Sequence, residues 1–202
     1  TKNVYMNGHD AGLKGTLTDS AKSATFVMDE LKAGDKVTIA GKEYSIGSTA
    51  DEAKASYAKA AAGDKVTIDG TEYTVVDAAT GTEDADNNEL KVTSLDGKVK
   101  DGSVVSYKTS KLTVMTDKNK DGVDDDDSSV ISKDVAEGKI LSELTAANNI
   151  GTVDQAATVA KAAANGKTTY TITKGYATVA DTLSFNLHVG ADADMTNKIN
   201  VS

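Results

Sequence analysis

Apolar and polar residues alternate in short stretches along much of this chain. Val37 and Ile39 are separated by polar neighbours, a turn dipeptide ending in Gly41 follows, and the apolar positions resume at Tyr44. Alternation with a period of two, interrupted by a glycine-containing dipeptide, predicts two antiparallel strands joined by a tight turn. This segment is therefore expected to form a β-hairpin.

The same pattern recurs further along the chain. Residues 33–39 read Ala-Gly-Asp-Lys-Val-Thr-Ile, and residues 62–68 repeat these letters. The match continues through the second strand, where Tyr73 stands at the position of Tyr44, and Asp69-Gly70 supplies the turn. An Asp-Gly dipeptide between alternating segments is a strong local hairpin signal. We expect a second hairpin here, with the recurring tyrosines packing in the core or across strands.

A helix is predicted before each hairpin. Residues 49–52 read Thr-Ala-Asp-Glu, a capping box in which Thr49 and Glu52 cap each other's backbone amides. Residues 20–31 carry apolar side chains at helical spacing before the first hairpin. A degenerate third copy is expected near the end, with a capping box at 152–155, a helix over 156–164 and a strand over 165–172, which includes Tyr170.

The segments outside the repeats are also predicted to contain both strands and helices. Residues 77–88 form a polar, acidic loop. Strands are expected over residues 90–95, 104–107 and 112–115, with Asp-Gly turns between them. Residues 134–148 fit a helix, whose expected buried side consists of Val135, Ile140, Leu141 and Leu144. The predicted fold class is α+β, built from repeated helix–β-hairpin units with antiparallel sheets in one or two small lobes.

These elements divide the chain into four parts. The predicted parts are paired terminal strands at 1–16 and 181–202, an outer lobe with two helix–hairpin repeats and a β-meander at 17–116, an acidic loop at 117–132, and a helical segment with the third repeat at 133–180.

Composition narrows the classes of function. The chain has no Cys, no Pro and no Trp, and a formal net charge of −9. Without Cys there is neither a disulfide nor thiolate chemistry. Every basic residue is Lys, whereas a nucleic-acid-binding surface normally shows a basic stripe containing Arg. No apolar run is long enough to span a membrane as a helix. Nucleic acid and membrane are therefore not expected as partners.

One segment has the spacing of a calcium-binding loop. Calcium prefers oxygen ligands, and an Asp-x-Asn-x-Asp-Gly sequence places them at loop positions one, three and five. The predicted ligands are Asp117, Asn119, Asp121, the backbone carbonyl of Val123, and Asp125. Position twelve departs from the pattern, because Ser128 stands where an acidic residue is expected. The competing interpretation is a solvated acidic loop.

Catalytic signatures are not found in the sequence. His9 and His188 are the only histidines, and a zinc site would need further ligands. No Gly-x-Ser-x-Gly motif and no correctly spaced phosphate-binding loop occur. We therefore expect a protein that is not an enzyme, with no catalytic residues and no cofactor other than possible Ca²⁺.

The two ends of the chain carry a resemblance to a known family. The end of the chain reads Thr182-Leu-Ser-Phe-Asn-Leu-His-Val-Gly-Ala-Asp192, and Asn197-Lys-Ile-Asn-Val-Ser202 follows after a short interval. This resembles the flagellin pattern of a strand ending in Gln-Val-Gly-Ala, a polar turn and a second strand. The beginning, Thr1-Lys-Asn-Val-Tyr-Met-Asn-Gly8, resembles the stretch that precedes it in flagellins. His188 and the pair Tyr5-Met6 depart from the usual residues.

The resemblance implies a structural role. The chain would be the surface-exposed variable region of a bacterial flagellin, inserted at the stem-domain hairpin and displayed extracellularly on the flagellar filament. Its partners would be other flagellin subunits, through stem helices outside this sequence, and host or glycan contacts. Thr1 and Ser202 are then expected to lie close together, and the isolated fragment is expected to be monomeric. The alternative is a calcium-stabilised bacterial cell-surface or adhesin binding module.

Overall fold

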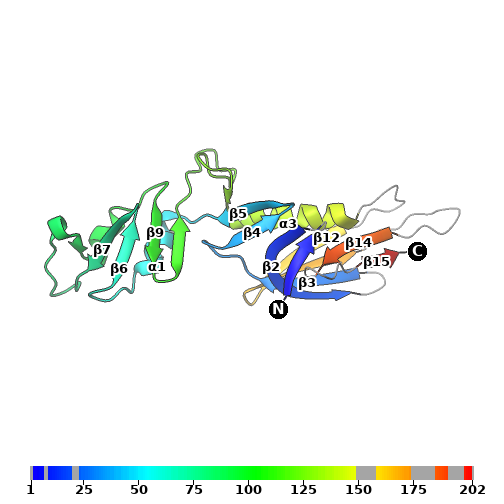
Figure 1. The fold of residues 1–202 in the computed structure, drawn as a ribbon, viewed down its shortest axis with the longest axis horizontal. Helices are drawn as coiled ribbons and strands as arrows, with labels where there is room; N and C mark the ends of the chain where they lie inside the picture. The colour runs from blue at the N-terminus through cyan, green and yellow to red at the C-terminus, as the bar shows by residue number, and fades with distance from the viewer. Residues whose placement is uncertain are drawn as a thin grey trace. The chain divides into compact units, whose positions relative to one another are not determined.

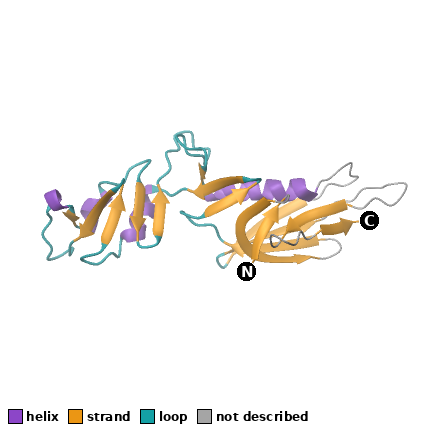
Figure 2. Ribbon diagram, viewed as in Figure 1, coloured by secondary structure: helices purple, strands orange, loops and turns teal. Residues whose placement is uncertain are grey.

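The protein folds into two compact units, each of which mixes helices with mainly antiparallel strands. The computed structural model describes residues 2–6, 9–19, 23–148, 158–173, 185–190 and 198–201. Unit 1 comprises Thr1–Leu31, Lys36–Tyr44 and Asp134–Ser202, and unit 2 comprises Lys32–Asp35 and Ser45–Lys133. Figure 2 shows that strands make up most of the regular structure, as expected for the predicted α+β class.

A seven-stranded sheet forms the framework of unit 1 (Figure 1). Its strands lie in the order β12 (Thr158–Ala164), β13 (Lys167–Thr173), β3 (Ser23–Asp29), β2 (His9–Asp19), β1 (Lys2–Met6), β14 (Phe185–Gly190) and β15 (Lys198–Val201). Each neighbouring pair is antiparallel. The sheet thus joins strands from the beginning of the chain to strands from its end.

Helix α3 (Lys133–Asn148) packs its apolar side chains into the core of unit 1. Ile140 and Leu144 are fully buried, which confirms the predicted helix and part of its buried side. Val135 and Leu141 are only partly buried, and Ala136 is buried instead. Within the sheet, the rings of Phe26 and Tyr170 stack with their centroids 6.1 Å apart.

The helix predicted over residues 20–31 is wrong, because residues 23–29 form strand β3. Ala24, Phe26 and Met28 are buried while the residues between them are partly exposed, so the burial has a period of two. The apolar spacing of this segment fits a helix and a strand equally well. Its pairing with β2 on one side and β13 on the other selects the strand.

The helix predicted over residues 156–164 is also wrong, because residues 158–164 form strand β12. This alanine-rich segment pairs along its whole length with β13, so tertiary pairing overrides its helical propensity. The turn between the two strands is Asn165-Gly166, with φ of 53° and 71°. The capping box predicted at 152–155 lies outside the described residues.

Strands from the beginning and from the end of the chain are neighbours in the seven-stranded sheet. Strand β14 pairs with β1 through Tyr5↔Gly190 and Met6↔Val189, and with β15 through Leu187↔Ile199. Both flanking strands are antiparallel to β14, so β1 and β15 run in the same direction. The start of β1 and the end of β15 therefore lie toward opposite ends of the strands. Thr1 and Ser202 themselves lie outside the described residues.

Unit 2 is built on a five-stranded sheet. Its order is β10 (Ser110–Thr113), β9 (Val104–Tyr107), β6 (Lys65–Ile68), β7 (Thr71–Val75) and β8 (Glu89–Leu90). Helix α1 (Ala50–Tyr57) packs Ala53 and Tyr57 into a core that includes Val66, Leu95 and Val105. The predicted capping box is confirmed, since the Glu52 amide donates to Thr49 Oγ1 and the Thr49 amide donates to Glu52 Oε1.

The strand predicted over residues 90–95 is wrong beyond its first residue. Leu90 ends β8, and helix α2 (Val92–Asp96) follows. The amides of Ser94 and Leu95 both donate to the carbonyl of Lys91, which closes the helical turn and buries Leu95. The acidic loop predicted before β8 contains a short 3₁₀ helix, η1 (Ala85–Asn87).

A smaller sheet has the order β11 (Val130–Ile131), β5 (Lys42–Ile46) and β4 (Lys36–Ile39). The outer strand of the five-stranded sheet continues into a parallel bridge between Ser48 and Val114. The Ser48 amide donates to the Thr113 carbonyl at 2.8 Å, and the Met115 amide donates to the Ser48 carbonyl at 2.9 Å. Gly47 permits this approach, because a Cβ there would lie 2.2 Å from Met115 Cγ.

The two hairpins, whose residues 33–39 and 62–68 are identical in sequence, have the same local geometry. Ala40 and Asp69 both adopt φ of 52°, and the glycines after them have φ of 80° and 82°. In the first hairpin, the Gly34 amide donates to Ile46 O and the Ile46 amide donates to Asp35 O, both at 2.8 Å. The equivalent atoms of residues 63, 64 and 75 make the same pair of bonds. Both predicted hairpins are thus present, but a preceding α-helix is found only before the second.

A third hairpin has the same pair of backbone hydrogen bonds at its base, although the sequence did not predict it as a copy. In β9–β10, the Gly102 amide donates to Val114 O at 2.9 Å, and the Val114 amide donates to Ser103 O at 2.8 Å. Lys108 occupies the left-handed turn position with φ of 53°. The repeat is not recognisable in the sequence, because Ser103 and Lys108 stand at the positions of Asp64 and Asp69 in the second copy.

The turn residues give a testable prediction. Ala40 adopts a left-handed conformation that Asn and Asp tolerate better than other side chains. Ala40→Asn is expected to increase the free energy of unfolding by about 0.5–1 kcal/mol. Urea denaturation measures this change, and Ala55→Asn in the middle of α1 provides the opposite control, because it lowers helix propensity. A loss of stability from Ala40→Asn would contradict the prediction.

Candidate functional site

The predicted calcium ligands lie in one loop whose carboxylates accept hydrogen bonds from its own backbone. The amides of Asp121 and Gly122 donate to the two carboxylate oxygens of Asp117, at 3.1 and 3.0 Å. Lys120 and Gly122 have φ of 59° and 78°, which turns the loop sharply. Asp117 therefore caps the bend at its first position.

The next two predicted ligands contact each other. Asn119 Nδ2 donates to Asp121 Oδ2 at 3.0 Å, and the Val123 amide donates to Asp121 Oδ1 at 2.8 Å. The Lys118 amide donates to Asp125 Oδ2 at 3.0 Å, which brings the last predicted ligand back to the start of the loop. The structure thus gathers the predicted residues in one loop and directs several of their side-chain oxygens toward backbone amides.

The buried aspartate of the loop was not singled out from the sequence. Asp124 is only 8% exposed, although it is one of four consecutive aspartates. One of its carboxylate oxygens accepts from the Thr116 amide at 2.7 Å, and the other accepts from the amides of Asp126 and Asp127 at 3.1 and 2.8 Å. Its own amide donates to Val130 O. Asp124 therefore organises both sides of the acidic loop.

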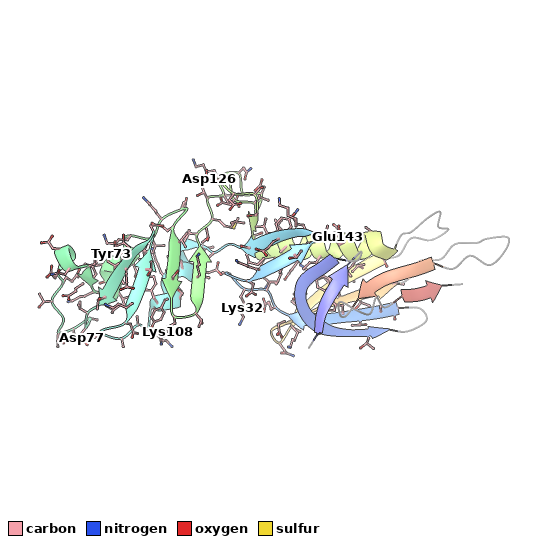
Figure 3. The ribbon with its side chains drawn as sticks, in the orientation of Figure 1. Lys32, Tyr73, Asp77, Lys108, Asp126 and Glu143 are labelled. Carbon is pink, nitrogen blue, oxygen red and sulfur yellow. The ribbon has the colours of Figure 1, made fainter. Side chains whose placement is uncertain are left out.

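Its neighbour Asp126 is exposed on the same loop (Figure 3). Nothing in the sequence separates Asp124 from Asp126, because both lie in the same run of like residues. The difference comes from the strand that follows. Asp124 pairs with Val130, and Val123 forms an antiparallel bridge with Ile131.

Within the part of the chain that the structure describes, no group of three or more His, Cys, Asp or Glu residues has the arrangement of a metal site. The predicted ligand set contains an amide and a backbone carbonyl as well as carboxylates. Calcium binding by Asp117, Asn119, Asp121, Val123 and Asp125 remains a prediction, to be decided by titration.

Two tyrosines of unit 2, Tyr57 and Tyr107, use their hydroxyls to hold elements together. Buried Tyr57 donates to Asp96 Oδ1 at 2.7 Å, and burial followed by this bond raises the pKa of Tyr57. Tyr107 donates to Asp64 Oδ2 at 2.6 Å, and this bond is the main cause of the lowered pKa of Asp64. These hydrogen bonds join separate elements, and both tyrosines stay protonated at neutral pH.

The tyrosines that recur in the repeats are packing residues. Tyr44 and Tyr73 are half-buried, and Tyr170 is fully buried. Lysine ammonium groups lie over the two half-buried rings, with Lys42 Nζ 5.1 Å from the Tyr44 centroid and Lys98 Nζ 5.4 Å from that of Tyr73. Lys139 also covers Tyr44. The faces of these rings are therefore partly occupied by cations of the same chain.

The two histidines are located on strands β2 and β14. In the strand register, His9 lies opposite Met6 and His188 lies opposite Lys198. Neither histidine is paired with the other. Their backbone positions give no support to a shared histidine site.

Comparison with protein-family models, with curated proteins and with solved structures finds no match. In the described segments, no helix has the length and apolarity needed to cross a membrane. The residues themselves are therefore the basis for a functional proposal.

The position of Asp124 generates a second prediction. Asp124→Ala removes the acceptor of three backbone amides, and their loss is expected to lower the free energy of unfolding of unit 2 by about 2–4 kcal/mol. Asp126→Ala is the matched control, because it removes the same charge from an exposed position of the loop. Urea denaturation of both variants checks the difference, and equal effects would refute the role of Asp124.

Calcium binding is tested by titration calorimetry. If the predicted ligands bind Ca²⁺, one site is expected, with a dissociation constant of about 0.1–1 mM, as in extracellular modules. Asp121→Ala should abolish the heat of binding, whereas Asp126→Ala should leave the single site in place. An absence of heat at millimolar calcium would eliminate the site.

Proposed function

We propose that this chain is the surface-exposed variable region of a bacterial flagellin, and that it serves as a structural component of the flagellar filament. In this role it would form part of the outer surface of the filament and determine its antigenic and contact properties. Stem helices outside this sequence would make the contacts with other subunits. The proposed location is therefore extracellular.

One observation carries the proposal. The two segments that resemble flagellin lie at opposite ends of the sequence, yet β1 and β14 are direct neighbours in the sheet. Strands β14 and β15 form an antiparallel pair, as the resemblance implies for the stem hairpin. Coincidental sequence matches would not be expected to pair in this way. The pairing therefore supports the proposal that both segments belong to the stem of one flagellin.

The region between these segments fits a structural insertion. It contains hairpins that share one anchoring pattern, in which a glycine amide and the carbonyl of the next residue bond to the end of the second strand. We infer that this part grew by duplication of a hairpin, with helices α1 and α2 before the second and third copies. Duplication of one packing unit adds surface area without assembling unlike catalytic groups.

The charge of the chain also agrees with an exposed role. A net charge of −9 keeps a surface solvated and opposes nonspecific association. A calcium-stabilised adhesin module would share this property, so charge does not separate the two functions. The residues that flank this chain in its gene do separate them.

The test combines the coding sequence with localisation. Long Cys-free helical heptads are expected on both sides of this chain, and antibodies raised against it should label flagellar filaments along their length in immunogold electron microscopy. A strain with the flagellin gene deleted serves as the control. Flanks with a signal peptide and a wall anchor, together with labelling of the cell wall, would overturn the proposal.

A further inference from the structure

Helix α3 is held against the sheet of unit 1 by a polar cluster. Glu137 on α3 accepts from Lys161 Nζ on β12, with 2.6 Å between Nζ and Oε2. The Glu137 side chain is 5% exposed and that of Lys161 is 34% exposed, so the carboxylate is the deeply buried partner. The contact places α3 beside β12, as Figure 1 also shows.

A buried tyrosine belongs to the same cluster. Tyr170 on β13 lies directly opposite Lys161 in the antiparallel register, so their side chains extend from the same face of the sheet. The Tyr170 ring is fully buried and stacks on Phe26, with an interplanar angle of 20°. This packing fixes the position of its hydroxyl group.

Two polar atoms of this cluster lack a protein partner. Among the described residues, neither Glu137 Oε1 nor the Tyr170 hydroxyl makes a hydrogen bond, and both are buried. The same holds for Thr168 Oγ1, two residues before Tyr170 on the same face of β13. A buried polar group without a partner costs about 1–3 kcal/mol, and folded proteins satisfy nearly all such groups.

Glu137 and Tyr170 both neighbour Lys161, Glu137 through the ion pair and Tyr170 across the strand register. Burial is the main cause of the raised pKa of Tyr170, and the negative charge of Glu137 raises it further. An internal water typically makes about three hydrogen bonds to buried groups of this kind.

We propose that an internal water binds between α3 and β13, where it donates to Glu137 Oε1 and accepts from the Tyr170 hydroxyl. Thr168 Oγ1 is the available third partner. Glu137 is then bonded on both oxygens, to Lys161 directly and to Tyr170 through the water. This site positions α3 on the sheet, because each bond restricts the carboxylate from a different strand.

The sign of one substitution tests the site. If the Tyr170 hydroxyl is bonded to water, Tyr170→Phe breaks that bond and should raise the unfolding equilibrium constant about fivefold. If the hydroxyl is dry and unpartnered, the same substitution removes a buried unsatisfied group, and the constant should stay equal or fall. Tyr73→Phe is the matched control, because this half-buried tyrosine is expected to change little.

A double-mutant cycle provides the second measurement. The effects of Tyr170→Phe and Glu137→Gln are compared singly and together by urea denaturation. A water that links the two groups makes their effects non-additive, by about twofold or more in the unfolding constant. Additive effects, or stabilisation by Tyr170→Phe, would overturn the proposal. Thr168→Val tests the third partner in the same way, with destabilisation expected.

Discussion

Backbone pairing between distant segments is the constraint on which unit 1 depends. Strand β3 pairs with β13 along its full length, from Ser23↔Thr173 to Lys167↔Asp29. The Glu30 amide extends this pairing by donating to Gly166 O. Closing so large a loop costs conformational entropy, although the cost rises only slowly with loop length. The buried side chains of Phe26, Tyr170 and Ile172 compensate for it at this seam.

The pairing of β3 with β13 joins segments that lie before and after unit 2 in the sequence. Unit 2 consists of Lys32–Asp35 and Ser45–Lys133, which lie between β3 and α3 in the sequence, and none of these residues takes part in the pairing of β3 with β13. Unit 2 has its own core, centred on Tyr57, Leu95 and Val105. Its stability therefore rests on its own contacts, which suits a part of a protein that grows by insertion.

The fold was predictable from the sequence where local chemistry decides the structure. The hairpin turns at Gly41 and Gly70, the Thr49 capping box and the helix beginning near Asp134 all depend on residues close in sequence. Residues 23–29 and 158–164 could not be assigned correctly, because their apolar or alanine-rich patterns suit a helix and only distant partners make them strands. The opposite error occurs around Leu95, where the alternation of apolar and polar residues predicts a strand but residues 92–96 form a helix.

The candidate site was predictable only in part for the same reason. Spacing alone identified the residues from Asp117 to Asp125, and they do share one loop. The central position of Asp124 depends on its contact with Val130, and the cluster around Glu137 depends on the docking of α3. Neither contact leaves a signal in the residues themselves. Pairing between β1 and β14 likewise required the structure, although the motifs on them could be read directly.

The bridge at Ser48 would matter for a protein displayed in many copies, as proposed for this chain. An exposed outer strand has unpaired backbone amides and carbonyls. Strands of neighbouring molecules can form hydrogen bonds with these groups and cause aggregation. Here the Ser48 amide and carbonyl occupy the Thr113 carbonyl and the Met115 amide at that border. These two bonds occupy backbone groups at the Val114 end of the outer strand from within the same chain, which leaves fewer of them for a strand of a neighbouring molecule.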